Sequence, residues 1–105
     1  MCQPDEKEYF EAVERNDEDA VKRSIEEKNI KTYVSNFNKQ TGAHVAAEKG
    51  YLSIIKYLIG KDRELLMALD DMNRTVLHVA VINGHLDVVK YLIEDLKLDI
   101  LASEN

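Results

Sequence analysis

The sequence predicts an all-α solenoid of about three stacked helix-turn-helix units joined by hairpin-like loops. The main observation is an internal repeat: residues 41–59 return as residues 75–93, and ten of the nineteen positions are identical. Self-similarity at this period of 34 residues is typical of stacked supersecondary units. In addition, each copy holds two short apolar patterns at helical spacing with a glycine between them. Stacks of this kind usually act as binding surfaces.

The first helix of each clear copy has a recognisable start and end. Thr41 and Thr75 can each accept a hydrogen bond from an amide in the first turn, which contributes about 1 kcal/mol. The residues that follow are small or aliphatic, and residues 79–81 are expected to form the inner face of the last copy. Gly50 and Gly84 then mark the helix ends, because glycine readily adopts the left-handed conformation found there.

A second helix is expected after each glycine. In the first clear copy it runs from about Leu52 to Ile59, with apolar side chains at helical spacing along one face. A longer connection from Gly60 to Arg74 follows and ends in turn-forming residues, among which Asn73 is expected to be left-handed. The last copy repeats this apolar face with Leu86, Val88, Val89, Leu92 and Ile93.

A degenerate third copy precedes these two. Shifting the sequence by the same 34 positions places Asn16 on Gly50, and asparagine is the commonest non-glycine residue at a left-handed helix end. Polar Glu18 and Ser24 replace two leucines, as expected for an end unit with one face in water. We therefore predict a single domain over residues 1–105. Its units are a capping repeat at about 5–38 and repeats at 39–72 and 73–105, without a C-terminal cap.

The pattern T-x-x-H-V-A-x-x-x-G-x-L-x-x-x-K-Y-L-I in both clear copies resembles the ankyrin repeat. The resemblance covers about residues 8–101 and implies an ankyrin-repeat solenoid. Gly42 and Val76 stand where the family has proline, and Lys39 replaces the usual turn glycine. Losing the proline removes a preset φ angle but no hydrogen bond, so the fold is expected to be kept.

The tetratricopeptide repeat also has a period of 34 residues. It needs two longer helices with tight connections. Here the first helix has room for about nine residues, and about fifteen residues separate Ile59 from Thr75. The spacing therefore favours the ankyrin repeat.

Histidines recur at one place in the repeat, three residues after the capping threonine. By resemblance, His44 and His78 bond that threonine and neighbouring backbone and so tie the stack together. The alternative is a shared metal ion, but equivalent positions are a whole repeat apart, too far for two nitrogens at about 2 Å from one zinc. His85 is likewise interpreted as structural. We expect no metal and no other cofactor.

Composition and charge argue against several kinds of partner and location. The net charge is −6, and residues 5–19 carry eight acids against two bases. We interpret this segment as a solvated helix face; the alternative is a surface that attracts a basic partner. No cluster of Lys and Arg suits phosphate, so nucleic acid is not an expected partner. No apolar run approaches the roughly 20 residues that cross a bilayer, no signal-peptide core is visible, and Cys2 is the single cysteine. We expect no membrane insertion and an intracellular location, cytoplasmic or nuclear.

Catalysis is not expected. The sequence holds no nucleophile elbow, phosphate loop or HExxH motif. The carboxylate pair Asp70 and Asp71 lies in a predicted turn, with no evident means of raising one pKa for acid/base work. The chain is therefore predicted not to be an enzyme.

By resemblance, target proteins meet the hairpin tips and the exposed ends of the first helices on the concave face. Carried over position by position, this implies the partner-binding residues Glu14, Arg15, Phe37, Asn38, Gln40, Glu48, Lys49, Asp71, Met72, Arg74, Ile82 and Asn83. The apolar members, Phe37, Met72 and Ile82, are candidate anchors. The alternative for each is packing beneath a hairpin.

We therefore expect a non-catalytic scaffold that binds a partner protein. The alternative is a structural or regulatory N-terminal segment of a larger ankyrin-containing protein, such as an enzyme or a channel, whose activity lies elsewhere. The last unit is aliphatic and is followed by Leu96, Leu98, Ile100 and Leu101. Because solenoids need polar terminal caps, we expect this end to continue into further repeats or to dock on another subunit.

Overall fold

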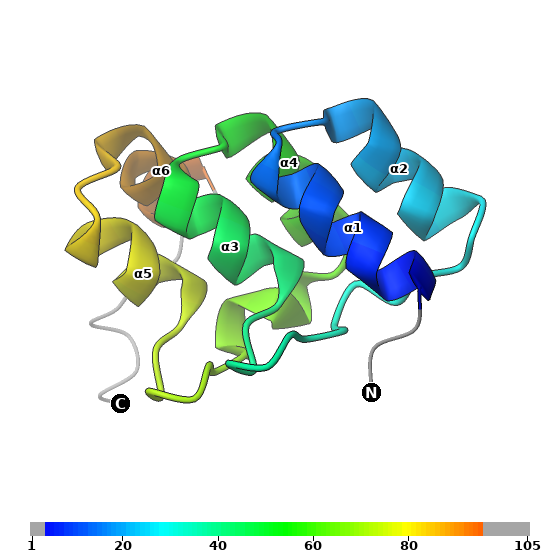
Figure 1. Cartoon of the computed structure of the whole chain (residues 1–105). Helices are drawn as coiled ribbons and strands as arrows, with labels where there is room; N and C mark the ends of the chain where they lie inside the picture. Colours follow the sequence, from blue (N-terminus) through cyan, green and yellow to red (C-terminus); the bar gives the residue numbers. More distant parts are fainter. Residues whose placement is uncertain (1–3, 96–105) are drawn as a thin grey trace.

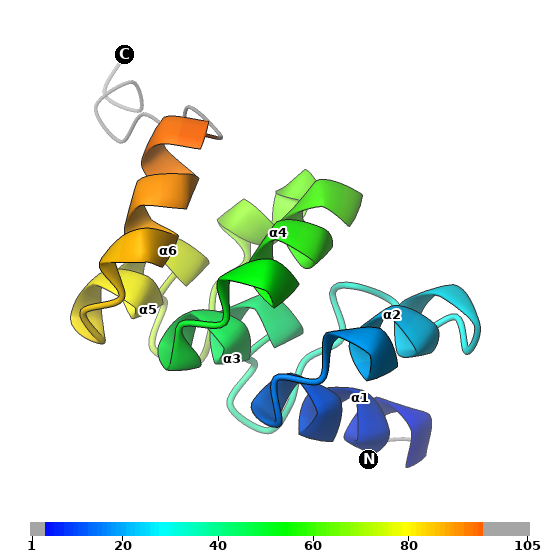
Figure 2. The same ribbon diagram turned by 90° about the horizontal axis from the view of Figure 1, so that it is seen from above.

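The computed structural model describes residues 4–95 and shows helices stacked in two layers (Figures 1 and 2). The first layer holds α1 (Pro4–Glu14), α3 (Gly42–Lys49) and α5 (Val76–Ile82). The second holds α2 (Glu18–Glu26), α4 (Leu52–Lys61) and α6 (Leu86–Lys90). A 3₁₀-helix, η1 (Arg63–Met67), follows α4, and a π-helical turn, η2 (Tyr91–Asp95), continues α6. The apolar residues noted near the C-terminus, Leu96, Leu98, Ile100 and Leu101, lie outside the described residues.

The predicted all-α solenoid is confirmed. Each first-layer helix contacts the second-layer helix that follows it, and within the first layer α3 contacts both α1 and α5. Between residues 4 and 95, the extended pairing is limited to one isolated bridge, Ser35 with Thr41, at the base of the first hairpin-like loop. The apolar face of α4 supplies much of the core, because Ile54, Ile55, Leu58 and Ile59 are fully buried.

The starts and ends of the first helices follow the predicted pattern. The Thr41 side chain accepts a hydrogen bond from the His44 N–H, and His44 Nδ1 accepts one from the Thr41 N–H at 3.2 Å. This reciprocal capping box satisfies two amides that a helix start leaves unpaired, and α5 begins with the same arrangement. Gly50 and Asn16 are both left-handed, with φ of 78° and 60°, as predicted.

The inner face predicted for the last repeat needs one correction. Val79 and Ala80 are buried as expected, but Val81 is 57% exposed. The equivalent residue Ala47 is fully buried where α5 packs against α3. Among the described residues, no element covers α5 in the same way on its other side, so Val81 belongs to the open end of the stack.

The glycine at the proline position is explained by Tyr9. The Tyr9 side chain is fully buried, and a Cβ added to Gly42 would overlap its hydroxyl and lie 2.7 Å from its Cζ. A larger residue at position 42 would therefore displace the ring from the contact between α1 and α3. Burial raises the pKa of the Tyr9 hydroxyl, which has no hydrogen-bond partner among the described residues. This hydroxyl consequently costs stability.

Two substitutions test the contact between Tyr9 and Gly42. We expect Tyr9→Phe to raise the free energy of unfolding by about 1 kcal/mol, because it removes a buried hydroxyl without a partner. Gly42→Ala should lower it by about 1–3 kcal/mol, because the added carbon overpacks the site. Urea denaturation followed by circular dichroism measures both effects. A loss of stability in Tyr9→Phe would contradict the burial of an unpaired hydroxyl.

His44 links the start of α3 to the next hairpin. Its side chain is fully buried, and its Nε2 lies 2.9 Å from the carbonyl oxygen of Arg74. Since a carbonyl can only accept, Nε2 carries the proton and Nδ1 accepts from Thr41. The ring is therefore neutral, and burial lowers its pKa below the ordinary value of 6.5. These contacts give His44 the structural role predicted for it.

The lowered pKa of His44 predicts a pH-dependent stability. The unfolded chain binds a proton at this residue near pH 6.5, whereas the folded chain does so only at a lower pH. The free energy of unfolding should therefore fall as the pH decreases below about 6.5, toward the folded-state pKa. Urea midpoints measured from about pH 7.5 to about pH 5 report this slope.

The equivalent histidine provides the control for this pH dependence. His78→Gln changes an exposed residue and should leave most of the slope in place, whereas His44→Gln should remove it. An unchanged slope in the His44 variant would assign the pH dependence to other groups.

Candidate functional site

Two hairpin tips lie along one edge of the stack, at the lower side of Figure 1. The tips comprise residues 36–40 and residues 70–74. Each is closed by a backbone hydrogen bond from its first residue to its last, Asn36 to Gln40 at 3.0 Å and Asp70 to Arg74 at 3.1 Å. The same turn is therefore built twice at a spacing of 34 residues.

A left-handed residue occupies the fourth position of each tip. Lys39 has a φ of 60° and Asn73 has a φ of 61°. Asn73 was predicted to be left-handed, and Lys39 adopts this conformation although it replaces the usual turn glycine. The first tip therefore keeps the backbone of the second despite a residue type that rarely favours it.

A buried carboxylate organises the second tip. Asp70 accepts hydrogen bonds from the N–H groups of Met72 and Arg74 and from the Arg74 guanidinium, each at 2.9 Å. Burial alone would raise the pKa of Asp70, but these hydrogen bonds outweigh it and lower the pKa. Asp70 is therefore held ionised as a structural group, and its environment is opposite to that of a general acid.

Asn36 has the equivalent role in the first tip. Its side-chain oxygen accepts from the N–H groups of Asn38 and Gln40, and its amide nitrogen donates to the Gln40 side chain at 3.2 Å. Sequence reasoning missed these two organisers. The available signal was that Asn36 and Asp70 are 34 positions apart and belong to residue types that bond their own backbone in turns.

The two tips are joined to each other. The Asp71 N–H donates to the Asn38 carbonyl at 2.9 Å, and His44 reaches the Arg74 carbonyl from the start of α3. Arg74 and Gln40, both predicted to bind a partner, are thus also engaged within the tips. The result is a continuous surface on which the remaining tip side chains are displayed.

The three predicted apolar anchors are all exposed. Phe37 is 95% exposed, Met72 is 68% exposed and Ile82 is 62% exposed. None of them packs beneath a hairpin, so the alternative considered from the sequence does not apply. Exposed apolar side chains of this size on polar tips are typical of interaction sites.

An open groove of about 450 Å³ runs between the first tip and α1. Phe10 and Phe37 form its apolar part, while Lys7, Glu11 and Glu14 provide charged groups along its wall. The structure thereby brings together two predicted residues, Phe37 and Glu14. Lys7, Phe10 and Glu11 were not predicted, because only the fold places the first tip beside α1.

The predicted residues at the ends of the first helices are also exposed: Glu14, Arg15, Glu48, Lys49, Ile82 and Asn83. They lie at the opposite end of the first layer from the second tip. Gln40 and Lys49, for example, flank the eight residues of α3, which span about 12 Å. The predicted set therefore forms two borders of one face, with the first-layer helices between them.

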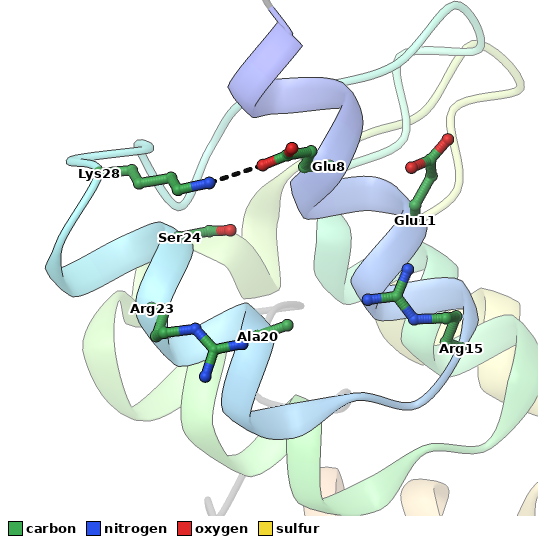
Figure 3. A pocket seen from close by; sticks show the side chains of 7 residues that line it. All are labelled: Glu8, Glu11, Arg15, Ala20, Arg23, Ser24 and Lys28. Carbon is green, nitrogen blue, oxygen red and sulfur yellow. Dashed lines mark hydrogen bonds and ion pairs between the residues drawn. The ribbon is translucent and has the colours of Figure 1, made fainter.

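A second cleft, of about 270 Å³, lies between α1 and α2 (Figure 3). It is lined by charges of both signs, and Lys28 Nζ pairs with Glu8 Oε1 across it at 2.6 Å. Arg15 is held outside the cleft by Asp17 at 3.3 Å. This arrangement is the polar end face expected for the first unit.

Within residues 4–95, no group of His, Cys, Asp and Glu side chains is arranged to hold a metal ion. The same part of the chain contains no helix long and apolar enough to cross a membrane.

Comparison with known proteins agrees with this geometry. A family model that describes three copies of the ankyrin repeat matches residues 9–103. A search of curated proteins finds no match to the chain. The matched family consists of non-catalytic modules that generally mediate protein–protein interactions. The chain belongs to the ankyrin repeat family.

Proposed function

We propose that this chain is a non-catalytic scaffold that binds a partner protein through its hairpin tips and the concave face of its first-layer helices. The observation that carries the proposal is the exposure of three large apolar side chains, Phe37, Met72 and Ile82, along the borders of that face. Family membership supports protein binding in general. An intracellular location, cytoplasmic or nuclear, is part of the same proposal.

The groove beside α1 supports a particular kind of contact. Phe37 and Phe10 offer an apolar surface to a bulky aliphatic or aromatic side chain of the partner. Glu11 and Glu14 lie along the same groove, so a Lys or Arg next to that side chain would find an opposite charge. The acidic α1 would then contribute to the rate of association rather than serve only as a solvated surface.

The tips are suited to this role because they are already ordered. Asn36 and Asp70 fix the two tip backbones by hydrogen bonds, and the link from Asp71 to Asn38 fixes one tip against the other. A partner would therefore meet side chains on a prearranged backbone, which reduces the entropy cost of binding.

The second candidate function is a structural or regulatory segment of a larger ankyrin-containing protein. The exposed end of the stack, at Val81 and Leu86, favours this reading. The unit boundaries at about 38 and 72 stay a prediction under either function.

A set of surface variants tests the proposed binding face. Phe37→Ala, Met72→Ala and Ile82→Ser remove exposed side chains, so each should change the free energy of unfolding by less than about 0.5 kcal/mol. Affinity capture from lysate, followed by binding measurements with the retained protein, should show that at least one weakens binding by about 30-fold or more, as for a hot-spot residue.

Tyr33→Ala is the matched control, because Tyr33 is an aromatic residue that is 64% exposed but lies outside the tips. It should bind as well as the parent. Equal binding by the parent and by a folded variant carrying all three substitutions would reject the proposed face. Capture of no specific protein would favour the second candidate function.

A further inference from the structure

The contacts between neighbouring units follow a series that stops at the end of the stack. The Tyr51 hydroxyl donates to the Glu14 carbonyl at 3.3 Å, and His85 Nε2 donates to the Glu48 carbonyl at 2.8 Å. In both cases a ring residue of one unit reaches the last turn of the preceding first helix. The next carbonyl in the series is that of Ile82, where the described part of the chain shows no such bond.

The glycines at the ends of the first helices repeat this difference. A Cβ added to Gly50 would lie 2.6 Å from His85 Nδ1, so the imidazole ring rests directly on this glycine. Around the equivalent Gly84, no atom of the described residues lies within 4 Å of a Cβ position. The place that a ring occupies on α3 is therefore open on α5.

The capping histidines form a second series. His44 and His78 make the same contacts with their threonines, but only His44 is buried and bonded through Nε2 to a carbonyl of the following hairpin. His78 is exposed, and no bond to its Nε2 is found within residues 4–95.

The apolar surface is also uncovered at this end, which α5 and α6 form (Figure 2). Val81 is 57% exposed where Ala47 is fully buried, and Leu86 is 77% exposed where Leu52 is half-buried. Apolar side chains of this size are stabilised by about 1.5–3 kcal/mol each when they are fully covered. We call this surface, comprising His78, Val81, Gly84 and Leu86, the end face.

We infer that the end face is a docking site for the helix pair of a further ankyrin repeat, in continuation of the stack. The incoming pair would place a histidine or tyrosine ring on Gly84 and donate from it to the Ile82 carbonyl. A carbonyl of its hairpin would accept a hydrogen bond from His78 Nε2. Its first helix would cover Val81, as α5 covers Ala47.

A second copy of this chain fits less well. Stacked head to tail, it would present its first unit, where Asp17 takes the place of Tyr51 and His85. An ionised carboxylate cannot donate to the Ile82 carbonyl, and Asp17 is already bonded to the Ala20 N–H and to Arg15.

The test extends the full chain by a copy of residues 72–105 placed directly after Asn105, which keeps the 34-residue register. The extended protein should unfold in one transition at a higher urea concentration than the original chain. Its binding of a hydrophobic dye should decrease, because Val81 and Leu86 become covered. Separate unfolding of the added unit, with unchanged dye binding, would overturn the inference.

A matched series tests the ring contact itself. In the added unit, the histidine copied from His85 is replaced by Tyr, Ala or Asp. Tyrosine, which makes this contact at position 51, should retain the stabilisation. Alanine and aspartate should each lower the folding equilibrium constant by at least about fivefold, the loss expected for one hydrogen bond. Equal stability of all four proteins would overturn the proposed geometry.

Self-association is checked with the original chain. Sedimentation equilibrium should show a monomer, and Leu86→Glu should not change that result. A dimer that Leu86→Glu dissociates would assign the end face to a second copy and reject a further repeat as its occupant.

Discussion

The stack depends on the hydrogen bonds of a single buried histidine. His44 accepts from Thr41 through Nδ1, which fixes the start of α3, and donates to the Arg74 carbonyl through Nε2, which fixes the next hairpin. A local helix cap is thereby coupled to a contact 30 residues further along the chain. Because the ring is buried, losing either bond would leave an unpaired polar group in the interior, so both are maintained together.

The binding surface inherits its order from this coupling. The second tip is anchored at Arg74 by His44 and is shaped internally by Asp70, whose carboxylate is buried and fully bonded. The first tip repeats the same turn with an uncharged asparagine, Asn36. Two different side chains thus produce one backbone geometry, and variable residues such as Phe37 can be displayed on it without changing the fold.

Much of the fold could be predicted from the sequence because its signals are local. A threonine three residues before a histidine, and a glycine or asparagine able to adopt a positive φ, define a helix by the bonds made within one or two turns. The exposed anchors were also predictable from their position in the repeat. The groove was not, because Phe10 and Phe37 are 27 positions apart and meet only when α1 packs beside the first tip.

The sequence by itself determined the repeat, the order of the helices, their caps and the tips as candidate binding elements. Tertiary structure alone decided which equivalent residues differ in environment. Val81 and Ala47 share a position in the repeat, as do His78 and His44, yet one member of each pair is exposed and the other is buried. The same holds at position 42, where glycine is required by the Tyr9 ring. The physical reason is that periodicity specifies what a unit presents to its neighbour, whereas burial depends on whether a neighbour is there and what side chain it brings.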